Sequence, residues 1–384
     1  MFFYLITFLL CFFLDTNSLR KKQNAYIFCS LWMFCFLCFG YMCGSDWRSY
    51  ERDYTQDTYD HYEIGSYLVF NVFKTLNVDF WVFTGFFKVL YLRALLSLAS
   101  EFTEKKWSVI GIEFIIGSLL YMLISCPFRF MLATTMVLYA IVLFLKNRKL
   151  YALIFLLASC TFHLVFIVNV LLLLSYFVFG KLINRLSPLI LIISYCLVFV
   201  IVRQSSIFST IYTYLVPFFQ FEEMAEGYRQ DLMGNMLSLG NLKEFLLFLL
   251  IVLFRKDILK LKHGNILLYF ALISSLLFIL LKCIPVGSRF NIVNKFFLSI
   301  VFAELLYMKV LKPIVRPMCR VIMGVCCLVT FYNIYNDVVF VPYSNSIPYI
   351  IMGHKPMSER SDYNINAYHE RTGKTYDPDD NSYK

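Results

Sequence analysis

The run FRFMLATTMVLYAIVLFL, residues 128–145, decides the fold, because eighteen consecutive positions hold a single charged side chain, Arg129. A helix of about 17 to 25 mostly apolar residues spans the hydrocarbon core of a bilayer. Similar runs recur along the chain, and 60% of its 384 residues are hydrophobic while only 16% are charged. The mean hydropathy is +0.67. These values exclude an ordinary soluble domain and predict an integral membrane protein.

The apolar runs are continuous and lack the alternation of outer-membrane strands, which predicts helices. Helices also satisfy their own backbone groups in a bilayer core that offers no water. We therefore predict an all-α polytopic membrane protein with about twelve transmembrane helices. The expected spans are residues 1–14, 25–43, 81–99, 107–125, 128–145, 150–164, 165–180, 187–202, 243–254, 265–282, 290–308 and 321–335.

Basic residues set the expected orientation, because Lys and Arg concentrate in cytoplasmic loops. Placing the basic segment 15–24 in the cytoplasm puts most basic loops on that side and the N-terminus outside. We expect residues 1–335 to form the transmembrane bundle, with outer loops 44–80 and 203–241. Residues 63–78 mix polar and apolar side chains, as interfacial helices do. Residues 336–384 are expected to form a polar extracytoplasmic C-terminal tail.

The net charge of +10 would suggest nucleic acid in a soluble protein, but here the basic residues explain topology, so no nucleic acid partner is expected. The twelve cysteines show no metal-site spacing and fall mostly within apolar runs. We expect them to be small buried apolar residues. No metal and no cofactor is predicted.

The segment GSDWRSYERDYTQDTYDHYE, residues 44–63, is the most polar stretch between spans and faces outward in the expected topology. Carboxylates beside aromatic rings suit sugar binding, because carboxylates accept hydroxyl hydrogen bonds and rings cover apolar sugar faces. Tyr50 and Glu63 are the candidate sugar-binding residues. A solvated loop is the alternative for most of these acids.

Several arginines lie on the expected outer side, against the positive-inside trend. Guanidinium groups grip phosphate through paired hydrogen bonds, so these residues are candidates for binding a lipid-linked diphosphate. For any single one, an arginine that snorkels to the interface is the alternative. The candidates are Arg48, Arg129, Arg203, Arg229 and Arg289.

Two residues could act as a catalytic base at the same boundary. Asp46 follows a span and precedes Arg48, so its carboxylate can orient an arginine or accept a hydroxyl proton. His163 interrupts an apolar stretch and can act as a base near neutral pH. A buried structural histidine is the alternative, and the sequence does not decide between the two bases.

In its pattern of short motifs the chain resembles the EpsG family of polysaccharide polymerases, relatives of the Wzy-type O-antigen polymerases. One departure is Ile64, where the family often carries a proline. The motifs that carry the resemblance are GSDWRSY (44–50), YEIGSYLVFNVF (62–73), FRFMLATTMVLYAI (128–141), SCTFHLVFIVNVLLLL (159–174), GSRF (287–290) and VPYSNSIPY (341–349).

The resemblance implies a GT-C-like helical bundle with interfacial helices and an active site on the extracytoplasmic side of the bacterial inner membrane. It implies transfer of a growing glycan from undecaprenyl diphosphate to the terminal sugar of a lipid-linked repeat unit. Asp46, Arg129, His163 and Arg289 would be the functional residues. Expected partners are the lipid-linked oligosaccharide, membrane lipid and a chain-length regulator. An O-antigen ligase and a lipid-linked oligosaccharide flippase are the alternatives, although a flippase predicts charges near the bilayer midplane.

Overall fold

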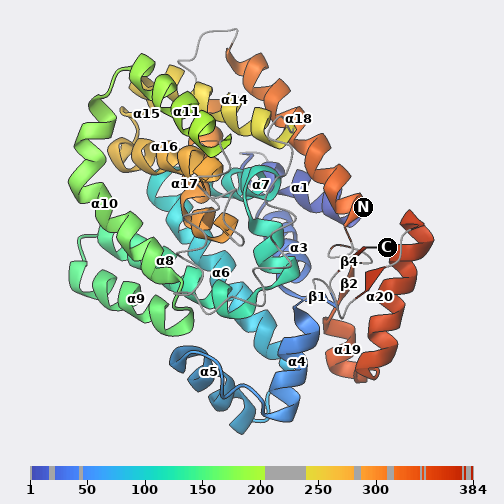
Figure 1. The fold of residues 1–384 in the computed structure, drawn as a ribbon. Helices are drawn as coiled ribbons and strands as arrows, with labels where there is room; N and C mark the ends of the chain where they lie inside the picture. The colour runs from blue at the N-terminus through green and yellow to red at the C-terminus, as the bar shows by residue number, and fades with distance from the viewer. Residues whose placement is uncertain are drawn as a thin grey trace. The chain divides into compact units, whose positions relative to one another are not determined.

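The structure is a computed structural model whose described part is almost entirely helical, with two short antiparallel strand pairs (Figure 1). The all-α prediction is confirmed. The described residues are 2–16, 22–42, 46–203, 239–280, 287–308, 315–337, 340, 343–373, 376–377 and 382–383.

Each of the twelve predicted apolar runs contains a helix. By length and composition, five helices in the described ranges can cross a membrane, and other apolar helices are shorter. The number of spans and the GT-C-like arrangement therefore stay predictions. The five helices are Phe80–Phe102, Phe128–Leu145, Phe166–Arg185, Arg289–Tyr307 and Pro317–Asn336.

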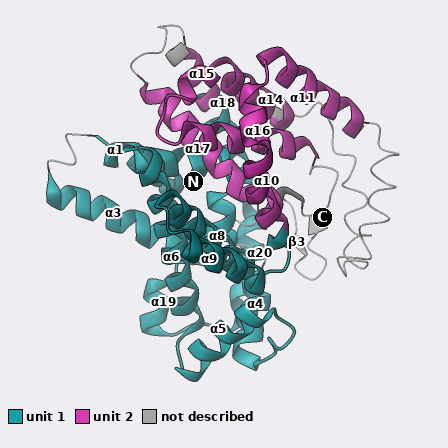
Figure 2. Cartoon of the chain, turned by 90° about the vertical axis from the view of Figure 1, so that its left-hand side faces the viewer, with its two compact units in different colours: residues 1–167, 324–384 teal, residues 168–323 magenta. Residues whose placement is uncertain are grey.

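The chain divides into two compact units, residues 1–167 with 324–384, and residues 168–323 (Figure 2). Unit 1 contains α1 (Phe2–Leu14), α3 (Gln23–Cys38), β1 (Gly40–Tyr41), α4 (Trp47–Gln56), α5 (Ile64–Thr75), α6 (Phe80–Phe102), α7 (Lys106–Ile116), the π-helical turn η1 (Tyr121–Ser125), α8 (Phe128–Leu145), α9 (Lys149–Phe162), β2 (Ser344–Asn345), α19 (Ile347–Met352), α20 (Met357–Thr372), β3 (Tyr376–Asp377) and β4 (Ser382–Tyr383).

Unit 2 is built around α16, which packs against α17, α14 and α11. The rings of Phe270 and Phe297 stack at 4.8 Å between α16 and α17. The elements of unit 2 are α11 (Pro188–Arg203), α14 (Leu239–Leu253), α15 (Arg255–Ile258), α16 (Gly264–Leu280), the 3-10 helix η5 (Gly287–Asn291) and α17 (Ile292–Tyr307), while α10 (Phe166–Arg185) and α18 (Val315–Asn336) cross the boundary between the units.

In unit 1, α8 packs against both α6 and α9, and an aromatic cluster fixes α4 and α5 to this group. Phe70 of α5, Phe83 of α6 and Phe128 of α8 are fully buried. Their ring centroids lie 5.1 Å (Phe70 to Phe83) and 4.7 Å (Phe83 to Phe128) apart. Tyr54 of α4 stacks on Phe83 at 5.2 Å. Aromatic contacts of this kind stabilise beyond simple area burial, so the two outer helices have a defined position on the apolar ones.

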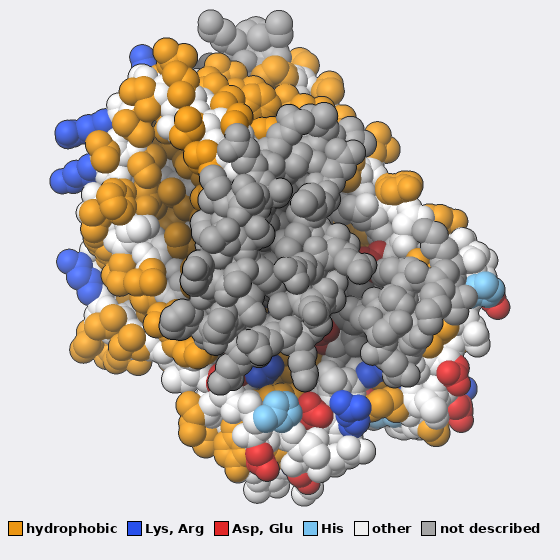
Figure 3. Space-filling view, in the orientation of Figure 1, with side chains coloured by type: hydrophobic (Ala, Val, Ile, Leu, Met, Phe, Trp, Pro, Cys, Tyr) orange, Lys and Arg blue, Asp and Glu red, His pale blue; other side chains and the backbone are white. Residues whose placement is uncertain are grey.

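Helix α5 forms within the segment predicted to be interfacial, residues 63–78. Its exposed large apolar side chains recur at intervals of four residues, at Ile64, Leu68 and Val72, and continue to Leu76 just beyond it. Such a stripe on one helix face is typical of helices that lie at a membrane surface. Figure 3 shows acidic and histidine side chains along the lower edge of the molecule, over α4, α5 and the C-terminal helices.

The predicted span 107–125 is broken in the structure. Helix α7 ends at Ile116, and the Glu113 carboxylate accepts a hydrogen bond of 2.9 Å from the backbone N–H of Ser118. After the π-helical turn, Cys126 adopts φ 53° and Pro127 precedes α8. The break arises because a carboxylate within the apolar run offers the backbone an alternative partner. It places Arg129 in the first turn of α8.

Part of the polar segment 336–384 folds within unit 1 and packs on its N-terminal part. Strands β1 and β2 pair in antiparallel register, with Gly40 opposite Asn345. Asn345 Nδ2 also donates to the carbonyl of Cys35 at 2.9 Å. Helices α19 and α20 follow β2 along the chain, and side chains of α20 contact α4. The C-terminal residues therefore contribute to the region where the predicted site lies.

Candidate functional site

Arg129 and Glu63 form the ion pair at the centre of the candidate site. Arg129 Nη1 donates to Glu63 Oε2 at 2.7 Å, and each side chain is about a quarter exposed. The guanidinium also lies over the ring of Tyr62, 4.5 Å from its centroid. Arg129 Nε is buried and has no hydrogen-bond partner among the described residues. The pair thus holds Arg129 in place and leaves part of its donor capacity for a ligand.

His163 lies beside the same carboxylate. Its Nδ1 is 3.6 Å from Glu63 Oε1, and its ring meets Phe130 edge-on at 5.6 Å. The residue ends α9 in an extended conformation, so its side chain leaves the helix at the C-terminal end. His163 therefore places an imidazole, a side chain that can accept a proton, beside the carboxylate that holds Arg129.

Tyr50 extends the cluster toward Asp46. The Arg129 guanidinium acts electrostatically on the Tyr50 hydroxyl, so the two groups lie near each other. Burial raises the pKa of Tyr50 to about 12, the positive charge of Arg129 lowers it, and the carboxylate of Asp46 raises it. Tyr50 is thus protonated at neutral pH and offers a hydroxyl to a ligand. Asp46 precedes α4, and its backbone carbonyl accepts the N–H of Tyr50 at 3.1 Å.

A close approach of α5 to α9 brings Glu63 to His163. A side chain at Gly65 would place its Cβ 2.5 Å from Thr161 Oγ1 and 2.8 Å from the Thr161 carbonyl oxygen. Next to it, Ser66 Oγ donates to the carbonyl of Phe162 at 2.9 Å. Only glycine permits this separation without displacing backbone atoms. The glycine after the acidic residue in YEIGSY is therefore part of the site's construction.

A buried lysine shares a small cavity with Tyr50 of this cluster. Lys88 of α6 is 2% exposed and lines a small cavity of about 10 Å³ together with Tyr50 and Cys126. Burial raises the pKa of Cys126, Lys88 lowers it and Asp46 raises it, so both charges lie near this thiol. Within the described residues, the Lys88 ammonium makes no ion pair or hydrogen bond. A buried charge without a partner is costly, which is typical of functional positions.

A second, fully buried ion pair connects α4 to α20. Arg360 donates to both oxygens of Glu51, at 2.8 and 3.0 Å, and the two side chains are 6% and 7% exposed. Trp81 Nε1 also donates to Glu51, at 3.2 Å. The Arg360 guanidinium lies 5.2 Å from the ring centroid of Trp47. This two-bond geometry satisfies both charges and holds α4 in place.

Next to this pair, His354 bridges two other segments. Its Nε2 lies 3.1 Å from Asp79 Oδ2, and its Nδ1 lies 2.9 Å from the Tyr41 hydroxyl. The other Asp79 oxygen accepts the backbone N–H of Trp81 at 2.8 Å and thereby caps α6. Asp79 therefore serves both the helix start and the C-terminal segment.

The structure brings together four of the predicted site residues, Glu63, Arg129, His163 and Tyr50, with Asp46 near Tyr50. Arg48 instead points to α20, where its Nε donates to Ser361 Oγ at 2.8 Å. Arg289 lies in η5 of unit 2. Arg203 is the last residue of α11, with its side chain outside the described part, and Arg229 lies outside the described residues.

Sequence reasoning missed the partners from the C-terminal segment, Arg360 and His354. They lie about 300 residues from their partners along the chain, in a polar segment without periodicity. The sequence does point to Lys88, because a lysine inside an apolar run is unusual. Within the described ranges, no group of three His, Cys, Asp or Glu side chains could hold a metal ion.

The EpsG family model matches residues 23–350, which is well over half of the chain. The chain belongs to the EpsG family. No curated protein and no solved structure matches it. The matched range includes every residue of the Glu63, Arg129 and His163 cluster, whereas Arg360 and His354 lie beyond it. Membership in the EpsG family, together with the apolar helices, indicates a membrane protein related to polysaccharide polymerases.

Proposed function

We propose that the protein is a polysaccharide polymerase that transfers a growing glycan from undecaprenyl diphosphate to the terminal sugar of a lipid-linked repeat unit. The reaction would take place at the extracytoplasmic face of the bacterial inner membrane. Family membership supports the class of reaction. The cluster of Glu63, Arg129, Tyr50 and His163 is the observation that carries the proposal, because it joins an arginine, a hydroxyl and a base from separate helices.

The electrostatics of the cluster suit a leaving diphosphate. Arg129 lies in the first turn of α8, a helix of 18 residues whose N-terminal end attracts anions. Lys88, which lines the same small cavity as Tyr50, adds a second positive charge to this region. Fixed cations that meet a growing negative charge lower the barrier to departure without needing to reorganise. The sequence also assigns diphosphate contacts to Arg48, Arg203, Arg229 and Arg289, and these stay predictions.

In the proposed step, the acceptor hydroxyl oxygen attacks the anomeric carbon of the growing glycan. The bond between that carbon and the diphosphate oxygen breaks, and the diphosphate leaves with the electron pair. His163 is the better-placed proton acceptor, because it lies in the same cluster as Arg129. Asp46 is the alternative base. Tyr50 would hydrogen-bond a sugar hydroxyl beside the reacting carbon. Glu63 holds Arg129 in place in this step, and direct sugar binding by Glu63 stays a prediction.

The experiment is a reconstituted polymerisation assay. The purified protein in proteoliposomes is given undecaprenyl-diphosphate-linked repeat units, and the products are separated by chain length on a gel. The proposal expects a ladder of products from the wild type. Arg129→Gln should lower the rate by about 100- to 1,000-fold, the usual effect of removing a group that stabilises a developing oxyanion.

Arg52→Gln is the matched control. Arg52 lies on α4 in the same outer region, is 60% exposed and contacts Asp53 at 3.8 Å. The Arg52→Gln substitution removes the same charge as Arg129→Gln and should leave the ladder of products unchanged. Absence of a ladder from the wild type, or equal losses from both variants, would refute the proposal. Single transfer to an acceptor that is not lipid-linked would indicate a ligase instead.

A further inference from the structure

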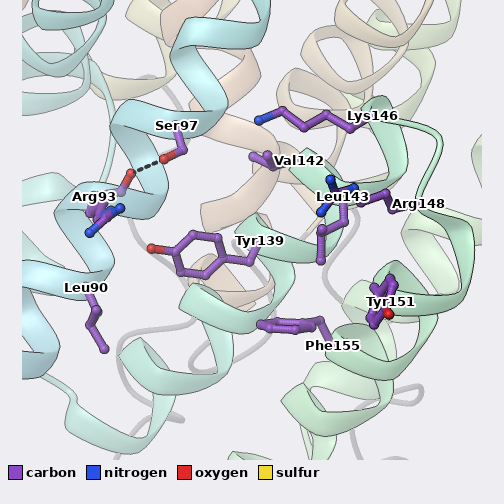
Figure 4. Close-up of a pocket in the computed structure, with 10 residues that line it drawn as sticks. All are labelled: Leu90, Arg93, Ser97, Tyr139, Val142, Leu143, Lys146, Arg148, Tyr151 and Phe155. Atoms are coloured by element: carbon purple, nitrogen blue, oxygen red, sulfur yellow. Dashed lines mark hydrogen bonds between the residues drawn. The ribbon is translucent and has the colours of Figure 1, made fainter.

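A basic cleft of about 520 Å³ lies at the opposite end of the helices that carry the candidate site. The site uses the first half of α6 with Lys88, the start of α8 and the end of α9. The cleft lies between the far halves of the same helices, and its charged lining residues are Arg93, Lys146 and Arg148 (Figure 4). It is therefore separate from the candidate site and at the end predicted to face the cytoplasm.

Arg93 is the residue that most needs an explanation. It lies nine residues before the end of α6, which is about 13 Å at 1.5 Å per residue. An arginine at this depth in an apolar helix is costly unless it meets a polar partner. Within the described part of the chain, its guanidinium has no ion pair or hydrogen bond. The Tyr139 hydroxyl is directed toward it in Figure 4.

The other two basic residues of the cleft, Lys146 and Arg148, line one of its walls. Lys146 follows α8 and pairs with Glu101 of α6 at 3.2 Å, while Arg148 precedes α9. Asn147 between them adopts φ 60°, which turns the chain sharply enough for both to face the cleft. Arg148, like Arg93, makes no side-chain ion pair with a described residue. Glu101 thus balances the charge of Lys146, one of the three cationic residues. The lining of the cleft therefore keeps a net positive charge.

The other walls of the cleft are apolar, and they continue onto an exposed apolar surface of the kind that contacts lipid. Leu143 and Phe155 line the cleft beside the cations. On α9, Tyr151 at the cleft and Ile154 beside it are exposed. A free anion would gain little from these apolar surfaces, whereas a lipid places acyl chains there and its phosphate among the arginines.

We propose that this cleft binds the phosphate group of an anionic membrane phospholipid. Arg93 and the Tyr139 hydroxyl hydrogen-bond the phosphate oxygens, Arg148 on the other side of the cleft adds positive charge, and the glycerol and acyl chains lie along α9. Basic pockets between transmembrane helices bind anionic head groups in this way. The inference is independent of the proposed polymerase activity.

The test is a lipid titration of the full-length protein in neutral detergent, followed by native mass spectrometry. The probes are dioctanoyl phosphatidylglycerol, dioctanoyl phosphatidylcholine and inorganic phosphate at equal concentrations. The wild type should retain phosphatidylglycerol in preference to the other two. Arg93→Gln and Arg148→Gln should each weaken that binding about fivefold, as expected for one cation near a phosphate.

Lys149→Gln is the control, because it removes the same charge from the residue next to Arg148 but does not line the cleft. Its affinity for phosphatidylglycerol should equal that of the wild type. The unfolding temperature of each variant is measured first, and Arg93→Lys, which keeps the charge, should restore part of the binding. Equal losses in all three glutamine variants, or binding of inorganic phosphate as tight as that of the lipid, would overturn the proposal.

Discussion

Helices α6, α8 and α9 present cations at both ends, but the surroundings of these cations differ. At the site end, Arg129 pairs with Glu63 at 2.7 Å, and nearby Arg360 pairs with Glu51 at 2.8 Å. At the cleft end, Arg93 and Arg148 have no acidic partner in the part of the chain that the structure describes. Paired cations in a packed aromatic setting have a fixed position, which catalysis needs. Cations without an acidic partner, beside an apolar wall, suit a ligand that brings its own negative charge.

The largest difference should appear in stability. Arg360→Met leaves Glu51 buried without its partner, and breaking a buried pair costs about 3–5 kcal/mol. Arg148→Gln at the cleft end should change stability by less than about 0.5 kcal/mol, as exposed positions do. Thermal unfolding in detergent measures both. A similar small effect for both variants would contradict the contrast between the two ends.

The close approach of α5 to α9 should give the next largest effect. Gly65→Ala inserts a Cβ within 2.5 Å of Thr161 Oγ1, so we expect a loss of about 1–3 kcal/mol from overpacking together with slower polymerisation. Gly324→Ala is the control, because a Cβ there meets no atom within 4 Å. It should be neutral or stabilising. If both glycine variants behave alike, the tight contact does not position Glu63.

Substitution of Lys88 should affect stability and activity in different ways. Lys88→Met keeps a long side chain and removes a buried charge, so we expect unchanged or higher stability, by up to about 1 kcal/mol. The polymerisation rate should nevertheless fall, by about tenfold if the ammonium supports the leaving diphosphate. Unfolding and rate are measured on the same preparation. A variant that is as active as the wild type would show that Lys88 has no catalytic role.

The smallest effect concerns pH. The pKa of Tyr50 is raised to about 12 by burial, whereas an unfolded tyrosine titrates near 10. The folded protein keeps the proton that the unfolded chain loses. The stabilising contribution of Tyr50 is therefore complete below about pH 10 and declines as the pH rises toward 12. Tyr50→Phe should show a shallower loss of unfolding temperature across that interval, and an identical slope would exclude burial of this hydroxyl.

The helices were predictable because apolar length is a local property. The run 128–145 coincides with α8, and the run 81–99 lies within α6. The run 107–125 was predicted as one span, but α7 ends at Ile116 because Glu113 accepts the Ser118 N–H. The apolar pattern does not reveal which way a single carboxylate turns.

The site was predictable where its residues had unusual settings. Arg129 stood alone in an apolar run, His163 interrupted another, and the acids before Gly65 formed a dense polar segment. The Glu51 and Arg360 pair was not predictable, because both residues sit among many other charges and the contact joins positions 309 apart.

The central claim is that Glu63 and Arg129 act as one unit in glycan transfer. A double-mutant cycle in the reconstituted polymerisation assay tests it most directly, with Glu63→Gln, Arg129→Gln and the combined variant. Since the carboxylate acts by holding the guanidinium, the combined variant should be no slower than Arg129→Gln alone. Rate losses that multiply in the combined variant would show that the two residues act independently, and would contradict this account of the site.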